Sequence, residues 1–216
     1  MVLFSDRTEA GRALASQLAK LDLPAPLVLA LPRGGVPVAV AVARELNAPL
    51  DLLLVRKIGV PWQPELAVAA IVDGQQPELV VDEETRQAAG VDQAYIDAEA
   101  KVQLQEIERR RRAYLGERLP LSVQGRTAIV VDDGIATGTS MRAALQALRR
   151  RNPAAIVLAV PVAPRETIQA LRRQVDQVVC LAQPEPFYAV GMHYRDFHQI
   201  EDAEVIAALS AMSKTP

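Results

Sequence analysis

The chain has 216 residues, half of them hydrophobic and only 4% aromatic, and its formal net charge is −2 at pH 7. This length fits one ordinary domain with a core built mostly from Ala, Val, Leu and Ile. The balanced charge argues against general nucleic-acid binding, which depends on neutralising phosphate groups. The single cysteine, Cys180, excludes an internal disulfide framework and a cysteine-rich zinc site. Because Cys180 lies in the apolar run Val178–Leu181, we expect a buried strand residue.

The first residues, Met1–Asp6, lack the basic stretch and long apolar run that mark a secretory signal. No apolar stretch reaches the roughly 20 residues needed to span a bilayer. We therefore expect a cytoplasmic protein with no membrane partner.

Short apolar runs predict strands at Leu27–Leu31, Leu52–Val55, Ala128–Val131, Ala155–Val160 and Val175–Leu181. They are rich in Val, Ile and Leu without clean alternation, which is typical of strands covered on both faces. Helical segments follow three of them, at Val36–Leu46, Thr139–Arg151 and Arg165–Gln174. This alternation predicts an α/β fold, with a mostly parallel central sheet and helices on both faces.

Two regions interrupt the alternation. Ala67–Val72 and Glu78–Val81 flank the turn signal Asp73-Gly74 and predict a hairpin. Asp92–Gly116 predicts an inserted long polar helix. We interpret its Arg109–Arg112 run as a solvated face balanced by nearby glutamates, although such a run can also contact nucleic acid.

The end of the chain changes in composition. Residues from Pro184 to Ile200 hold four aromatic side chains and both histidines, and Asp202–Met212 predicts a closing helix. We expect a single domain over residues 1–216. Its core covers about residues 25–182, and residues from about 183 to 216 form a small hood together with the N-terminal segment.

The segment Val130–Met141, Val-Val-Asp-Asp-Gly-Ile-Ala-Thr-Gly-Thr-Ser-Met, carries the most specific chemistry. Asp132 and Asp133 follow a buried strand, at the end where open α/β sheets place ligands. Small and hydroxylated residues then lead onto a helix N-terminus, which suits a monophosphate. Carboxylates accept hydrogen bonds from sugar hydroxyls, so the segment predicts a ribose 5-phosphate site. An ordinary capped turn would explain Gly134 and Thr139, but not two consecutive acids.

Val130–Ser140 resembles the phosphoribosyl-pyrophosphate (PRPP) signature of the type I phosphoribosyltransferases, with two hydrophobic residues, two acids and a Thr-Gly-Thr-type loop. The resemblance covers roughly residues 25–182 and implies the Rossmann-like α/β fold of that family. It implies that Asp132 and Asp133 hold the ribose hydroxyls. The implied 5′-phosphate loop consists of Gly134, Ile135, Ala136, Thr137, Gly138 and Thr139, with Ser140 as an additional donor.

The pyrophosphate half of the site is predicted from Leu31–Pro37, between a strand and a helix. Gly34 and Gly35 allow the backbone to approach an anion closely, although an ordinary strand-to-helix turn explains them too. The position resembles the family's pyrophosphate loop, which implies pyrophosphate contacts from Arg33, Gly34 and Gly35. It also implies a non-proline cis peptide bond in this loop.

A basic pair, Arg56-Lys57, follows the second predicted strand and resembles the pair near the catalytic loop of adenine-type members. The resemblance implies that Lys57, and with it Arg56, neutralises the leaving pyrophosphate. The residues that follow, Gly59, Pro61, Trp62 and Pro64, predict a mobile lid rather than a packed strand.

The acceptor is left open. In the family the hood binds the acceptor base, often by stacking, and the available aromatics are Phe187, Tyr188, Tyr194 and Phe197. They fit a small core under the hood equally well. His193 and His198 lack an obvious carboxylate partner and are weak evidence for a metal or a general base. Ala136 stands where members that use 6-oxopurines carry an acid/base Asp.

The resemblance implies a Mg²⁺-dependent enzyme of nucleotide metabolism, such as salvage. It would transfer the 5-phosphoribosyl group from PRPP to a nucleobase or related nitrogen heterocycle and release pyrophosphate. Catalysis would rest on Asp132, Asp133, Lys57 and Arg33, with Mg²⁺ held mainly by PRPP and indirectly by the two aspartates. A homodimer is expected. The alternative is a regulator that binds PRPP or a nucleotide without turnover and contacts RNA through Arg109–Arg112.

Overall fold

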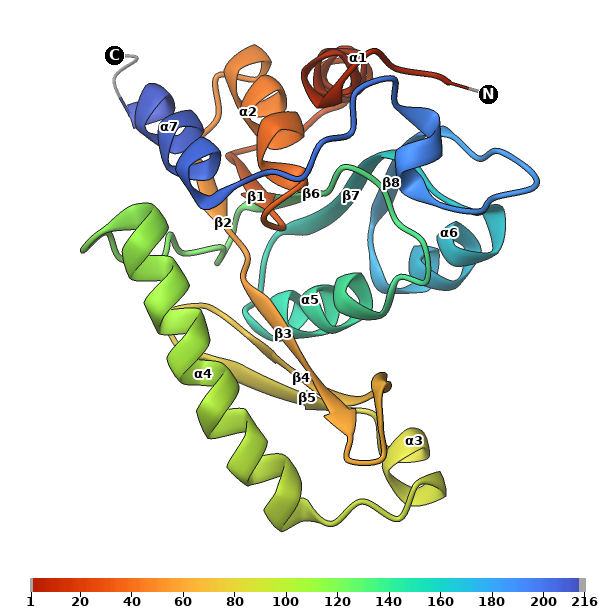
Figure 1. Cartoon of the computed structure of the whole chain (residues 1–216). Helices are drawn as coiled ribbons and strands as arrows, with labels where there is room; N and C mark the ends of the chain where they lie inside the picture. The colour runs from red at the N-terminus through yellow and green to blue at the C-terminus, as the bar shows by residue number, and fades with distance from the viewer. Residues whose placement is uncertain (1, 214–216) are drawn as a thin grey trace.

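The computed structural model describes residues 2–213, and its centre is a five-stranded parallel sheet (Figure 1). The strand order is β2 (Leu50–Leu52), β1 (Pro26–Ala30), β6 (Thr127–Val131), β7 (Ala155–Val162) and β8 (Gln177–Ala182). Every neighbouring pair in this sheet is parallel. The predicted α/β architecture is therefore confirmed.

Helices cover both faces of this sheet. On one face lie α1 (Arg7–Leu18), α2 (Gly35–Glu45) and α7 (Asp202–Ser213); on the other lie α5 (Thr139–Arg150) and α6 (Arg165–Leu171), which a 3₁₀ turn continues to Gln174 (Figure 1). Alternate residues of each strand enter different cores. Val28 packs with α2, whereas Leu29 packs with α5. Burial on both faces explains why these strands read as continuous apolar runs.

Helix α1 is an element that the strand-and-helix pattern did not predict. Asp6 caps it, because the Asp6 side chain accepts a hydrogen bond from the Glu9 backbone N–H at 2.8 Å. Ala10, Leu14 and Leu18 are buried at helical spacing. The Asp-x-x-Glu cap followed by this spacing is a sequence signal for the helix.

A second sheet is antiparallel and consists of β3 (Val55–Val60), β4 (Gln63–Val72) and β5 (Glu78–Val81). The predicted β4–β5 hairpin is confirmed. Helix α4 (Gln93–Leu115), predicted as the inserted polar helix, packs along this sheet, and α3 (Glu83–Ala88) follows β5.

The predicted strand Leu52–Val55 is wrong, because these four residues serve two sheets. Strand β2 ends at Leu52, Leu53 and Leu54 connect the sheets, and β3 begins at Val55. The prediction that the residues after Lys57 form no strand is also wrong. Gly59 lies in β3, Pro64 lies in β4, and exposed Trp62 sits in the turn between them.

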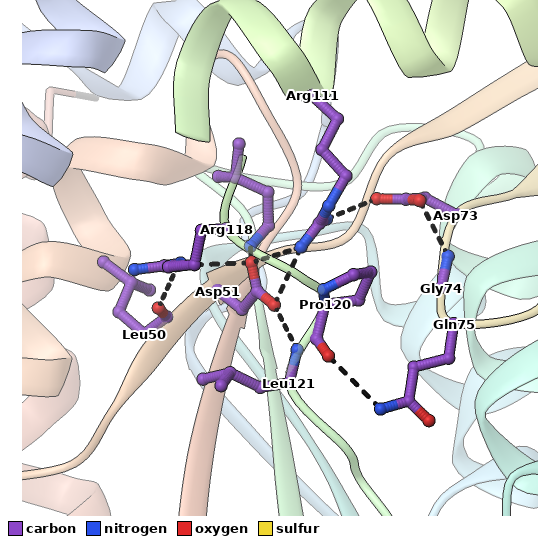
Figure 2. A network of polar contacts seen from close by, with 10 residues as sticks. Leu50, Asp51, Asp73, Gly74, Gln75, Arg111, Arg118, Pro120 and Leu121 are labelled. Atoms are coloured by element: carbon purple, nitrogen blue, oxygen red, sulfur yellow. Dashed lines mark hydrogen bonds and ion pairs between the residues drawn. The ribbon is translucent and has the colours of Figure 1, made fainter. Parts of the chain in front are cut away.

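A buried ion-pair network joins the two sheets (Figure 2). Arg111, on α4, donates from Nη2 to both carboxylate oxygens of Asp51 at 3.1 Å and from Nη1 to Asp73 Oδ2 at 2.5 Å. Arg118 and the backbone N–H of Leu121 also donate to Asp51. The side chain of Arg111 is only 11% exposed. The interpretation of Arg109–Arg112 as one solvated face is therefore wrong for Arg111.

The rest of the arginine run behaves as predicted. Arg109 and Arg110 pair with Glu106 one helical turn earlier, and Arg112 is exposed. These contacts lower the pKa of the Glu106 carboxyl to about 2, with the hydrogen bond from Arg109 as the largest cause. Within residues 2–213, no helix is both long and apolar enough to cross a membrane.

Candidate functional site

The two acids of the signature lie where β6 ends, as expected. The backbone N–H of Asp133 donates to Asp132 Oδ1 at 2.9 Å, and Asp133 is buried. The loop after β1 begins next to them, because Leu31 N–H donates to Val131 O at 2.9 Å. Both predicted halves of the site therefore start from neighbouring strands of the central sheet.

Gly34 and Gly35 bring the two loops into direct contact. A Cβ at Gly34 would overlap the carboxylate of Asp133, and one at Gly35 would lie 2.8 Å from Val131 O and 3.1 Å from Asp132 Oδ1. The backbone can pass this close only without side chains. The Pro32–Arg33 peptide bond is cis, so the expected non-proline cis bond is confirmed.

Arg7 is a site residue that the sequence reasoning missed. Its Nε donates to Asp133 Oδ2 at 2.8 Å, and its Nη1 donates to His198 O at 3.0 Å. Its guanidinium also lies 3.9 Å from the ring centre of Phe197. Arg7 is 6% exposed, and this burial is exceptional for an arginine unless it is paired.

Burial is the main electrostatic influence on the acidic pair. It raises the pKa of Asp132, and the neighbouring charge of Asp133 raises it further. Burial also raises the pKa of Asp133, while the hydrogen bond from Arg7 opposes that rise. The pair therefore favours a bound group that donates hydrogen bonds or carries positive charge.

The predicted phosphate loop, Gly134–Gly138, leads directly into α5 at Thr139. Gly138 has φ +76°, a left-handed conformation that favours glycine. Thr167 donates to Ala136 O at 2.7 Å, which ties the loop to α6. Thr137 and Thr139 are exposed and their hydroxyl oxygens lie 3.5 Å apart. The first N–H groups of a helix have no intrahelical acceptor, so this loop can bind an anion.

The three predicted basic residues have different surroundings. Arg33 Nη1 lies 3.5 Å from Asp202 Oδ1 and 3.7 Å from Glu201 Oε2, at the start of α7. Arg56 Nε donates to Gln103 Oε1 at 2.9 Å, so this side chain is directed toward α4.

Lys57 is exposed and pairs across the ladder with Ala70, which packs in the same core as α5. Cross-strand partners share a face, so Lys57 emerges on the α5 side. The structure therefore separates the two members of the basic pair onto opposite faces of β3.

Three of the four hood aromatics form a small core. Tyr194 is buried between Phe4 and Phe197, with ring centres 5.5 and 5.1 Å away. Phe187 packs against His193 at 5.2 Å. Tyr188 is 75% exposed. Of the two interpretations left open, the core under the hood is therefore confirmed for Tyr194.

The two histidines also differ. His193 is buried in the hood, and its backbone oxygen accepts hydrogen bonds from Leu3 and Phe4. The ring of His198 has two carboxylate partners, Asp196 at 3.0 Å and Glu204 at 2.9 Å. The expectation that no carboxylate partners the histidines is therefore wrong for His198.

The chain itself does not build a metal cage in the part that the structure describes, where no group of three or more His, Cys, Asp or Glu side chains could hold an ion. Asp132 and Asp133 provide oxygen donors of the kind Mg²⁺ prefers, but Asp133 is already bound by Arg7. This donor set fits a cation whose other ligands come from a bound substrate.

A separate cavity of about 400 Å³ lies at the opposite end of the sheet. Its lining includes Gln124 and Asn152, which precede β6 and β7, and the network residues Asp51 and Asp73. It is therefore distinct from the site around Asp132.

The glycine loop after β1 contacts the acid pair after β6, and a hydroxyl-rich loop leads from that acid pair into α5. This arrangement defines a phosphoribosyltransferase-type α/β protein. The chain belongs to the phosphoribosyl transferase family, since the family model described as a phosphoribosyl transferase domain matches residues 6–195.

Individual relatives agree with this assignment. A Mycobacterium tuberculosis protein with the name "Putative phosphoribosyl transferase Rv0571c" is 47% identical over 209 residues, which is 97% of this chain and 47% of the relative. The chain thus spans about half the length of that relative. The crystal structure of TT1426 from Thermus thermophilus is 43% identical, with a TM-score of 0.85 over 96% of this chain and 98% of that one.

Proposed function

We propose that the chain transfers the 5-phosphoribosyl group of PRPP to a nitrogen heterocycle, such as a nucleobase, and releases pyrophosphate. The observation that carries the proposal is the contact between Gly34 and the Asp133 carboxylate. It brings the predicted pyrophosphate loop and the predicted ribose-binding acids into one site. A protein that only held ribose phosphate would not need this second loop.

In the reaction, the bond from carbon 1 of the ribose to the pyrophosphate oxygen breaks and a bond from carbon 1 to the acceptor nitrogen forms. The proton that this nitrogen carried is released to water. The sugar gains positive charge as pyrophosphate leaves. Asp132 and Asp133 would stabilise that charge, and Arg33, Lys57 and the loop amides would stabilise the leaving group.

Magnesium would add to the stabilisation of the leaving group. When bound to the oxygens of PRPP, Mg²⁺ neutralises charge on the departing pyrophosphate. Asp132 and Asp133 would hold it indirectly, through water or the ribose hydroxyls. We also propose a cytoplasmic location, a homodimer, and one domain in which the N-terminal segment joins the hood.

The acceptor would bind beside the hood. Ala136 provides no acid/base group of the kind that 6-oxopurine-using members carry. Of the hood aromatics, Tyr188 is the one exposed enough to stack on a base. The alternative of an RNA-contacting regulator is weakened, because Arg111 is buried and both Arg109 and Arg110 are paired with Glu106.

The test is calorimetric titration with Mg²⁺ and PRPP, followed by a pyrophosphate-release assay with a panel of purine and pyrimidine bases. We expect donor binding and release with at least one base. The Asp133→Asn variant should lose on the order of 10²-fold in turnover. The matched control is Asp97→Asn, on an exposed part of α4, which should behave as wild type. Tight PRPP binding without release from any base would overturn the enzyme proposal.

A further inference from the structure

Arg7 contacts Asp133 although 126 positions separate them in the sequence. Three groups hold the guanidinium: the Asp133 carboxylate, the backbone oxygen of His198 and the ring of Phe197. A planar guanidinium donates hydrogen bonds in its plane to a carboxylate and a carbonyl while its face lies against an aromatic ring, a geometry that an ammonium group does not reproduce. The surroundings of Arg7 are therefore specific for arginine.

The hood fixes the segment that carries Arg7. Phe4 N–H donates to His193 O at 3.0 Å, Arg195 N–H donates to Phe4 O at 2.9 Å, and Asp196 N–H donates to Ser5 O at 2.9 Å. The chain then enters α1, whose first residue is Arg7. These backbone bonds fix the segment from which the Arg7 side chain extends.

Asp133 is held from two directions by this assembly. Arg7 binds its carboxylate, and the Tyr194 hydroxyl donates to its backbone oxygen at 2.5 Å. On the other loop, Gly34 lies against the same carboxylate. Arg7 and Gly34 therefore both restrict the position of the Asp133 carboxylate.

We propose that Arg7 is a positioning residue of the donor site, which fixes the Asp133 carboxylate and neutralises one of the two adjacent acidic charges. This inference rests on the proposed function. PRPP carries several negative charges, and two bare carboxylates beside it would repel it. Arg7 neutralises one of these two carboxylate charges. Because Arg7 approaches Asp133 from α1, the loop after β1 stays free to bind pyrophosphate.

The experiment is calorimetric titration of Mg²⁺–PRPP into wild type, Arg7→Gln and Arg7→Lys, with steady-state kinetics once an acceptor is known. We expect Arg7→Gln to weaken donor binding by on the order of 10- to 100-fold, because it removes a charge-assisted hydrogen bond from Asp133. Arg7→Lys should recover part of the loss, since it keeps the charge but not the planar fork. The KM for the acceptor should not change.

A double-mutant cycle separates positioning from a general structural role. If Arg7 acts through Asp133, the effect of Arg7→Gln on donor affinity should shrink strongly in an Asp133→Asn background. The matched control is Arg149→Gln, which breaks an exposed pair with Asp176 and should bind the donor as wild type does. Circular dichroism establishes that each variant is folded. If Arg7→Gln does not fold, Arg7→Lys carries the test, with an expected loss of several-fold.

Two results would overturn the inference. One is a folded Arg7 variant with wild-type donor affinity, and the other is an Arg7→Gln loss that is undiminished in Asp133→Asn. Failure of wild type to bind Mg²⁺–PRPP would instead refute the proposed function, and the donor-site role of Arg7 with it.

Discussion

The backbone of Gly34 lies directly against the carboxylate of Asp133, so that any side chain at position 34 would overlap it. Gly34 itself has φ −59° and ψ −35°, a conformation that every L-residue adopts readily. The requirement for glycine therefore comes from the neighbouring carboxylate and not from the backbone.

This contact predicts a specific effect of Gly34→Ala. The new methyl group must displace the Asp133 carboxylate, while the N-cap conformation of α2 tolerates alanine. We expect kcat/KM for PRPP to fall by on the order of 10²-fold, because a displacement of about 1 Å in a catalytic group has effects of that size. Thermal melting should show a folded protein. A fully active Gly34→Ala variant would contradict the assigned geometry.

Local sequence signals were sufficient for most of the central sheet and for the loops of the candidate site. The acid pair and the glycine loop each lie between a strand and a helix that are contiguous in sequence, so their positions follow from order alone. Arg7 could not be found in this way, because its partner lies 126 positions away. A lone arginine beside a helix cap carries no information about such a distant contact.

The arginine run shows the same limit on α4. Four consecutive arginines point in different directions around a helix, and the sequence does not reveal which one meets a buried acid. Arg111 is that residue, since its guanidinium pairs with both Asp51 and Asp73 (Figure 2). Similarly, Leu52–Val55 reads as one apolar strand, although the chain changes sheets within it.

Arg111→Met should destabilise the fold strongly. It leaves Asp51 and Asp73 buried without their shared cation, and breaking a buried pair from one side costs about 3–5 kcal/mol. In a protein of this size the melting temperature should fall by on the order of 10 °C. Burial raises the pKa of the Asp73 carboxyl even with Arg111 present. Without Arg111 the buried charge is uncompensated, so the variant should regain part of its stability at acid pH, where this carboxyl is protonated and neutral.

The matched control for Arg111 is its neighbour in sequence. Arg112 is exposed on the same helix, and Arg112→Met should change the free energy of unfolding by no more than about 0.5 kcal/mol. Urea denaturation of the two variants checks the difference. Equal stabilities would show that the buried network does not hold the two sheets together.

Cys180 offers a direct test of thiol reactivity, because it is the chain's single cysteine and no other thiol contributes to the signal. The predicted strand position is confirmed in β8, but the side chain is only partly buried because β8 is an edge strand. Burial raises the pKa of the thiol to about 11. Since the thiolate is the reactive form, alkylation by iodoacetamide at pH 8 should be about 100-fold slower than in the urea-unfolded chain. Equal rates in the folded and unfolded chain would contradict this pKa.

His198 provides a prediction for pH dependence. Hydrogen bonds from its ring to Glu204 and Asp196 raise its pKa above the ordinary 6.5. The chain has two histidines, so a proton NMR titration has to distinguish the His198 signals only from those of His193. Because the folded pKa is the higher one, the stabilisation is fully present below pH 6.5 and is lost as pH rises through the folded pKa. The melting temperature of wild type should therefore exceed that of His198→Gln most at pH 6, and the difference should shrink toward pH 8. Glu204→Gln should lower the midpoint of the His198 NMR titration, because it removes the carboxylate with the largest effect on the pKa of His198. A wild-type midpoint at or below 6.5 would show that neither carboxylate binds the ring in solution.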